Sequence, residues 1–222
     1  LKNAVVTLND ETYTLADLTA VDGIYTITTK IAPNKANQAI ALVIEFNGKT
    51  HTLPISIATY AEVILNSDDK SHIEAHNLTY AMVEYVRAMT DDSFCSGVSE
   101  PVGYKSFELE KPDTIRNSAY SIAFCLDEMI TIAISGTEGE TITLKLPSGR
   151  VLEATVQSGA ALFSDLAVNE ISNTFVIVAG GQRIEYSLVD YYFAMEEPKD
   201  ADVIEALYSY AKYAFEYAKE HR

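Results

Sequence analysis

The chain has 222 residues, of which 48% are hydrophobic and 22% charged, a composition typical of a globular protein with one large or two small domains. Its 32 Asp and Glu against 16 Lys and Arg give a formal net charge of −16. A surface of that sign repels nucleic acid and anionic lipid, so we expect neither as a partner. Because no apolar run approaches the roughly 18 residues that a membrane span needs, we expect no membrane insertion either.

Residues 1 to about 54 carry the signals of strands and hairpins. Asn47-Gly48 follows the apolar run 39–46 and predicts a two-residue hairpin turn, with 49–55 as the return strand. Asn9-Asp10 is a second turn pair in the same region, and a further strand rich in β-branched residues is predicted at 24–28.

The pattern changes to a helical period at Ser56, which we predict to be an N-cap. The residues at helical spacing that follow it are Ile57, Tyr60, Ala61, Ile64 and Leu65. A polar break at 66–71 precedes a second helix, whose apolar stripe is Leu78, Met82, Tyr85, Val86 and Met89. We expect the two helices to form an antiparallel hairpin packed on the strands.

Residues 91 to about 117 are rich in Asp, Ser, Gly and Pro and predict a boundary between two units. Strand patterns then resume at 120–126, 129–134, 141–146, 151–156, 174–179 and 183–187, with Ser158-Gly159 and Gly180-Gly181 among the turns. A short helix follows Ser187 and a longer one begins near Asp200. The predicted fold class is mixed α+β, with residues 1–92 as one β unit plus helix pair, 93–117 as a linker and 118–222 as the second such unit.

The two halves of the chain also have similar sequences at corresponding positions. Ser56-Ile57-Ala58-Thr59-Tyr60 matches Ser187-Leu188-Val189-Asp190-Tyr191 at an offset of 131, and Tyr80-Ala81 matches Tyr210-Ala211 at an offset of 130. These matches favour an internal duplication in which Tyr60 and Tyr191 occupy equivalent buried positions. The alternative is two unrelated amphipathic helix pairs that both use tyrosine.

The matched motifs resemble a known repeat. Tyr186-Ser187-Leu188-Val189-Asp190-Tyr191, followed by Leu207-Tyr208-Ser209-Tyr210-Ala211, is similar to the repeat of large secreted surface proteins of gut Gram-positive bacteria, Tyr-Ser-Val-x-Asp-Tyr-Ala and then Leu-x-x-Tyr-Gly-x-x-Ala. Residues 31–34 and 53–57 resemble the same family, whereas Ala81 and Ala211 stand where it usually has Gly.

The resemblance implies an Ig-like β-sandwich followed by a helical hairpin, within a multi-domain exported protein. The chain opens at Leu1 and not at Met, which fits a piece of a longer polypeptide. The resemblance therefore predicts a non-catalytic structural or adhesion module, secreted or at the cell surface, whose partners are other domains of the same polypeptide. It implies no active site, and a glycan or a host or bacterial surface protein stays open as a further partner.

The residues that carry chemistry form no recognised constellation. His72 and His76 have the i, i+4 spacing of a helical metal pair but lack the His-Glu-x-x-His pattern and a third ligand. The acidic pairs favour solvated loops and helix ends over a glycosidase dyad or a calcium loop. These pairs are Asp68-Asp69, Asp91-Asp92, Asp127-Glu128 and Glu196-Glu197. We therefore predict no catalytic residues, no cofactor and no metal site.

The alternative function is a carbohydrate-binding module attached to a glycan-degrading enzyme. Sugar platforms favour exposed Trp, which is absent here, and this leaves five tyrosines as candidates: Tyr13, Tyr25, Tyr104, Tyr120 and Tyr213. The tyrosines at helical spacing favour core packing instead, and these are Tyr60, Tyr85, Tyr191 and Tyr210.

The two cysteines, Cys95 and Cys125, leave a disulfide open. The alternation of 121–126 favours Cys125 as a packed thiol and not as a reactive one.

Overall fold

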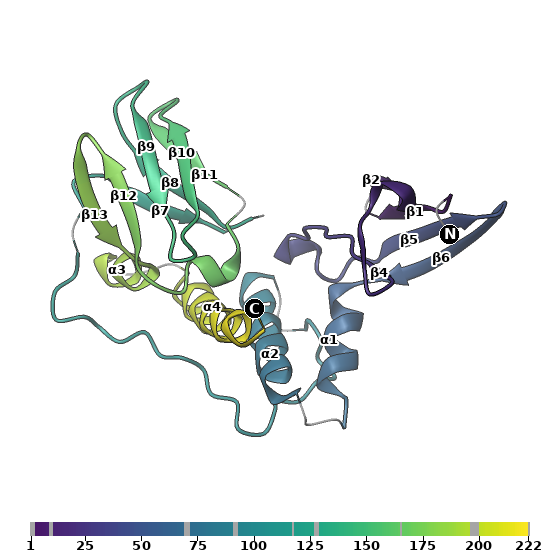
Figure 1. Cartoon of the computed structure of the whole chain (residues 1–222). Helices are drawn as coiled ribbons and strands as arrows, with labels where there is room; N and C mark the ends of the chain where they lie inside the picture. The colour runs from purple at the N-terminus through teal and green to yellow at the C-terminus, as the bar shows by residue number, and fades with distance from the viewer. Residues whose placement is uncertain are drawn as a thin grey trace.

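The computed structural model describes residues 3–8, 11–68, 72–90, 93–116, 118–126, 129–164, 166–195 and 200–221. These residues form four α-helices and several antiparallel sheets, which confirms the predicted mixed α+β class. Figure 1 shows a β-rich region at each end of the molecule and helices α2 (Ile73–Met89) and α4 (Ala201–Glu220) side by side between them. Within the described ranges, no helix is both long and apolar enough to cross a membrane.

The first β region is a four-stranded antiparallel sheet with the order β2-β1-β5-β6. Its strands are β1 (Val5–Leu8), β2 (Glu11–Thr14), β5 (Ile40–Phe46) and β6 (Lys49–Ile55). The turn between β5 and β6 is the predicted one, because Asn47 and Gly48 both have positive φ, of 50° and 72°. Asn9 and Asp10 lie outside the described residues. The strand predicted at 24–28 is shorter: β3 (Ala20–Val21) and β4 (Ile24–Tyr25) form a separate two-stranded ribbon.

The second β region consists of two sheets. One has the order β10-β9-β12-β13, from β9 (Thr141–Lys145), β10 (Val151–Thr155), β12 (Phe175–Ala179) and β13 (Gln182–Tyr186). The other has the order β11-β8-β7, from β7 (Ile122–Cys125), β8 (Thr131–Ser135) and β11 (Ala160–Phe163). All six predicted strands are present, and β11 is the strand that the sequence pattern missed.

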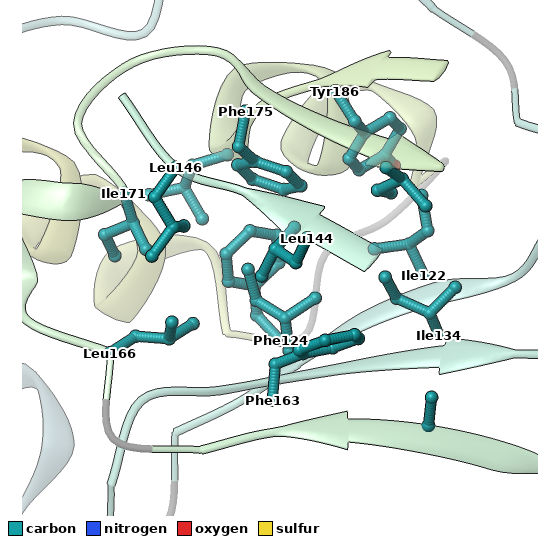
Figure 2. Close-up of a cluster of buried hydrophobic side chains, with 14 of the residues drawn as sticks. Ile122, Phe124, Ile134, Leu144, Leu146, Phe163, Leu166, Ile171, Phe175 and Tyr186 are labelled. Atoms are coloured by element: carbon teal, nitrogen blue, oxygen red, sulfur yellow. The ribbon is translucent and has the colours of Figure 1, made fainter. Parts of the chain in front are cut away.

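The two sheets enclose one hydrophobic core. Figure 2 shows Phe124, Ile134 and Phe163 of one sheet facing Leu144 and Phe175 of the other. The alternation of the strands explains the arrangement, since β8, β9 and β12 each place every second side chain in the core. The residues that are completely buried there include Ile132, Ile134, Ile142, Leu144, Phe175 and Ile177, each 0% exposed.

The first sheet repeats the β10-β9-β12-β13 sheet in order and in register. Each consists of two antiparallel hairpins whose first strands pair with each other. In the first sheet Leu8 pairs with Leu42, which pairs with Leu53. In the second, Leu144 pairs with Ile177, which pairs with Ile184. A one-residue slip would turn these rows to the opposite face, so the shared register gives the two sheets matching apolar faces.

Each sheet passes into a helix through the same N-cap. Helix α1 (Ile57–Leu65) follows Ser56, whose Oγ accepts a hydrogen bond of 3.0 Å from the Thr59 amide. Helix α3 (Leu188–Ala194) follows Ser187, whose Oγ accepts one of 3.2 Å from the Asp190 amide. Both serines have φ of −148°, with ψ of 161° and 169°. The predicted cap at Ser56 is confirmed, and the caps repeat at the same offset as the sequence match.

The longer helices make the most extensive helix–helix contact in the molecule. They are α2 (Ile73–Met89) and α4 (Ala201–Glu220). Tyr85 of α2 is 3% exposed, belongs to the sandwich core and stacks on Tyr210 with the ring centroids 6.0 Å apart. Val83 and Val86 of the same helix belong to a second cluster that includes Ala61 of α1. Helix α2 therefore takes part in both cores, a contact that the sequence analysis did not foresee.

The segment that leaves α2 is held against the helices at both of its ends. Arg87 donates to the carbonyls of Phe94 and Cys95, each at 2.8 Å. Further along, the Arg116 amide donates to the buried Asp190 carboxylate at 3.1 Å, and the Arg116 guanidinium pairs with it at 3.2 Å. The division into 1–92, 93–117 and 118–222 stays a prediction.

The prediction that Tyr60 is buried is wrong. Tyr60 is 61% exposed, whereas Tyr191 is half-buried and lies with its ring centroid 5.0 Å from that of Phe124 on β7. The local sequence and the N-cap are equivalent at the two sites. The difference arises because β7 has no counterpart beside Tyr60 among the strands of the first region.

The interpretation of Cys125 as a packed thiol is also wrong. Ile122 and Phe124 face the core from β7, so Cys125 lies on the opposite face and is exposed. Cys95 is the buried thiol, with Sγ 3.7 Å from the carbonyl oxygen of Ala58. Both cysteines are free, so the disulfide that the sequence left open is not formed.

Candidate ligand groove

A groove of about 670 Å³ lies between α2, the segment 100–109, α3 and α4. Its lining combines aromatic rings with carboxylates, a pairing suited to ligands that offer both apolar faces and hydrogen-bond donors. The aromatic residues are Tyr80, Tyr104, Phe107, Tyr192 and Phe193, and the acidic residues are Glu84, Glu100, Glu108, Asp202 and Glu205.

The aromatic wall is held by ring contacts and by hydrogen bonds to α4. Tyr104 stacks on Tyr213 at 5.3 Å between centroids, and Tyr80 meets the Tyr104 ring edge-on at 4.8 Å. The Tyr213 hydroxyl donates to the Lys105 carbonyl at 2.9 Å. Burial raises the pKa of Tyr104 well above its usual range. These contacts fix the rings before any ligand arrives.

The acidic side of the groove includes one strong hydrogen bond. The Tyr192 hydroxyl donates to Glu205 Oε1 at 2.6 Å, and this bond is the main reason why the pKa of Tyr192 is raised. Glu84 is paired with Arg87 at 2.7 Å. A hydroxyl-rich ligand can stack its C–H face on the rings while its hydroxyls donate to carboxylate oxygens, which accept only.

The structure brings together two of the five tyrosines predicted as sugar-platform candidates. Tyr104 and Tyr213 stack on each other beside the groove. The other three lie elsewhere: the Tyr13 hydroxyl bonds Glu11, Tyr25 lies in the first β region, and Tyr120 bonds Glu140 at 3.3 Å. The sequence analysis did not identify Tyr80, Tyr192 and Phe193 as groove residues. All three lie on helices, where a residue that lines a groove has the same spacing as a core residue.

Several residues that were considered as metal ligands or catalytic groups lie within the described part of the chain. His76 Nδ1 lies 2.9 Å from the carbonyl oxygen of His72, and no group of three or more potential metal ligands occurs among the described residues. Two buried acids, Asp190 and Glu170, are held by hydrogen bonds and by Arg116 and Arg150. Of the four acidic pairs predicted to be solvated, only Asp68 lies among the described residues. The residues of these pairs that lie outside them are Asp69, Asp91, Asp92, Asp127, Glu128, Glu196 and Glu197.

Comparison of the chain with protein-family models, with curated proteins and with solved structures finds no match. The resemblance to the surface-protein repeat therefore rests on the residues quoted above.

Proposed function

We propose that the chain is a non-catalytic structural module of a larger secreted or cell-surface bacterial protein, built from two Ig-like units that are each followed by a helix pair. In this role the module holds its neighbours in the polypeptide at a fixed spacing. The observation that carries the proposal is the position of α2, which takes part in the core of the sandwich through Tyr85. Through Val83 and Val86 it also takes part in a second cluster, which includes Ala36 and Ala61 of the first half.

A shared helix makes a stiff joint. Domains joined only by a linker move relative to each other unless a large apolar interface prevents it. Here α4 packs along α2, and Tyr85, Leu207 and Ala211 are all buried. Bending the joint would expose this surface, at roughly 25 cal/mol for each Å² of apolar area. The aromatic pair Tyr85–Tyr210 adds a directional contact at its centre.

Spin-label distances test the rigid joint. Labels at the exposed Thr50 of β6 and Gln182 of β13, in a Cys95→Ala, Cys125→Ser background, report the separation of the two β regions. We expect a single narrow distance distribution, as narrow as that of a control pair within one sheet, Glu153 and Gln182. Tyr85→Ala should broaden the distance between regions and leave the control pair unchanged. A broad distribution in the parent protein would contradict the spacer role.

The second candidate function is carbohydrate binding, and the groove of aromatic rings and carboxylates favours it. Affinity electrophoresis against plant and mucin polysaccharides tests it directly. Phe193→Ala and Glu205→Gln should both abolish any retardation, whereas Tyr25→Ala, far from the groove, should not. Equal mobility of the parent protein with and without every polysaccharide would remove this candidate and leave the spacer proposal intact.

A further inference from the structure

The first sheet presents an apolar face that the described part of the chain covers only in part. A groove of about 930 Å³ runs over it, lined by Val6 and Leu8 of β1 and by Leu42, Ile44 and Phe46 of β5. Its polar lining is limited to Asn47, Lys49 and His51, at the β5–β6 turn and on β6. A partner for this face must therefore be mainly apolar.

The second unit shows how the same face is covered. Leu8 and Leu42 of the first sheet correspond in register to Leu144 and Ile177 of the second, both 0% exposed. Leu8 is itself 7% exposed and Leu42 is half-buried, so the first sheet is open over β5 and β6 more than over β1. Leu144 and Ile177 are buried because Ile122, Phe124, Ile132 and Ile134 of the hairpin β7–β8 belong to the same core. The hairpin precedes β9 directly, through residues 136–140.

The third strand of the covering sheet also has a counterpart. In the second unit β11 lies between β10 and β12 in the chain and pairs with β8. In the first unit β3 and β4 occupy that place in the chain, and Tyr25 and Ile27 contact the groove. Yet β3 and β4 pair only with each other, and Val21 and Ile24 are 69% and 67% exposed.

Two further pairs of equivalent residues differ in exposure, as expected if the first unit lacks a hairpin that the second unit has. Ile55 pairs with Ile40 at the end of its hairpin as Tyr186 pairs with Phe175, but Ile55 is 39% exposed and Tyr186 only 5%. Tyr60 is 61% exposed, whereas its equivalent Tyr191 rests on Phe124 of β7. In both pairs the more exposed residue belongs to the first unit.

We propose that the open face of the first sheet binds an amphipathic two-stranded β-hairpin that joins β1 from its N-terminal side, as β7–β8 joins β9. The hairpin places a row of alternating apolar side chains over Leu42 and Leu53, beside the already buried Leu8, and its second strand pairs with the β4 segment. The first unit then becomes a two-sheet sandwich like the second. This inference rests on the duplicated sheet and is independent of the spacer role.

A fusion tests the proposal on the full chain. A copy of residues 118–140 is added ahead of Asn3, so that its strands precede β1 as they precede β9, with Asn3 and Ala4 as two additional connecting residues. The control fusion has the same length and carries Ile122→Ser, Phe124→Ser, Ile132→Ser and Ile134→Ser in the added copy alone. Binding of the dye ANS reports the open apolar face, and hydrogen exchange reports the amides of β5.

We expect the fusion to lose most of the ANS fluorescence of the parent chain and to slow exchange across 40–46, and the control fusion to do neither. Leu53→Asp, at a side chain that is 52% exposed, should leave the melting of the parent chain unchanged and abolish the protection in the fusion. Equal ANS binding and equal exchange in the two fusions would overturn the proposal. A parent chain that sediments as a dimer, and as a monomer after Leu53→Asp, would also overturn it, since the occupant would then be a second copy.

Discussion

The two four-stranded sheets have the same strand order, the same register and the same N-cap, but the apolar face of the first sheet is covered less completely than that of the second. Leu144 and Ile177 of the second sheet are 0% exposed, whereas their equivalents Leu8 and Leu42 are 7% exposed and half-buried, respectively. Leu53 is 52% exposed, and its equivalent Ile184 is half-buried. The secondary structure of each sheet is therefore encoded locally, by alternation, turns and caps. Its stability depends on what lies over its apolar face, and that differs between the two regions.

The largest expected effect concerns equivalent core residues. Ile177→Ala should lower the free energy of unfolding by about 2–5 kcal/mol, because the side chain is completely buried and leaves a cavity. Leu42→Ala removes a similar side chain from the half-buried equivalent position and should cost about 1 kcal/mol. Urea denaturation of the two variants measures both values. Equal losses would show that the first sheet is as well covered as the second.

A smaller difference is expected between the paired tyrosines. Tyr191→Ala should lower the stability by about 2–3 kcal/mol, below the range for a fully buried aromatic, because Tyr191 is half-buried against Phe124. Tyr60→Ala should change it by no more than about 0.5 kcal/mol, as for other exposed sites. Thermal melts of both variants decide the matter. A shift for Tyr60→Ala as large as that for Tyr191→Ala would mean that Tyr60 is buried in solution.

The pH dependence of stability should depend on a buried tyrosine of the second sheet. Burial raises the pKa of Tyr186 to about 12 from its usual value of 10.0. Its contribution to stability is therefore complete below pH 10 and is lost as the pH rises to 12, a loss of roughly 2 kcal/mol. Tyr186→Phe removes this ionisable group and should flatten that part of the profile. Unfolding free energies measured from pH 9 to 12 would contradict the assignment if both proteins showed the same slope.

The smallest perturbation is chemical labelling of the two thiols. Cys125 is exposed on the outer face of β7, whereas burial raises the pKa of Cys95 and lowers its thiolate fraction. An alkylating reagent should therefore modify one cysteine quickly in the native protein and the second only after unfolding. Intact mass over time gives the result. Two fast reactions would show that the cluster around Cys95 is open.

The local elements could be predicted from the sequence because their signals lie in neighbouring residues. Ser56 and Asn47-Gly48 specify a cap and a turn through their own backbone geometry. The short strand β11 was missed because Ala160–Phe163 is brief and begins with two alanines, which carry little strand propensity.

Tertiary contacts could be predicted from the sequence less well than the local elements. The alignment of Tyr60 with Tyr191 correctly relates two positions in the chain, but burial depends on a strand far away in sequence, and only Tyr191 has one. The apolar stripe that includes Tyr85 predicted a buried helix face and could not specify α4 as its partner. The groove brings α2, α3, α4 and 100–109 together, so its lining could not be read from any single stretch of sequence.

Native-state hydrogen exchange of the full chain tests the central claim most directly. The backbone hydrogen bonds of β5 and β12 are equivalent, so a difference in protection must come from the packing over each sheet. We expect amides of 175–179 to exchange only through global unfolding and those of 40–46 to exchange earlier, through local opening of the first sheet. Equal protection of the two strands would contradict the account, because it would mean that an open sheet and a covered one are equally stable.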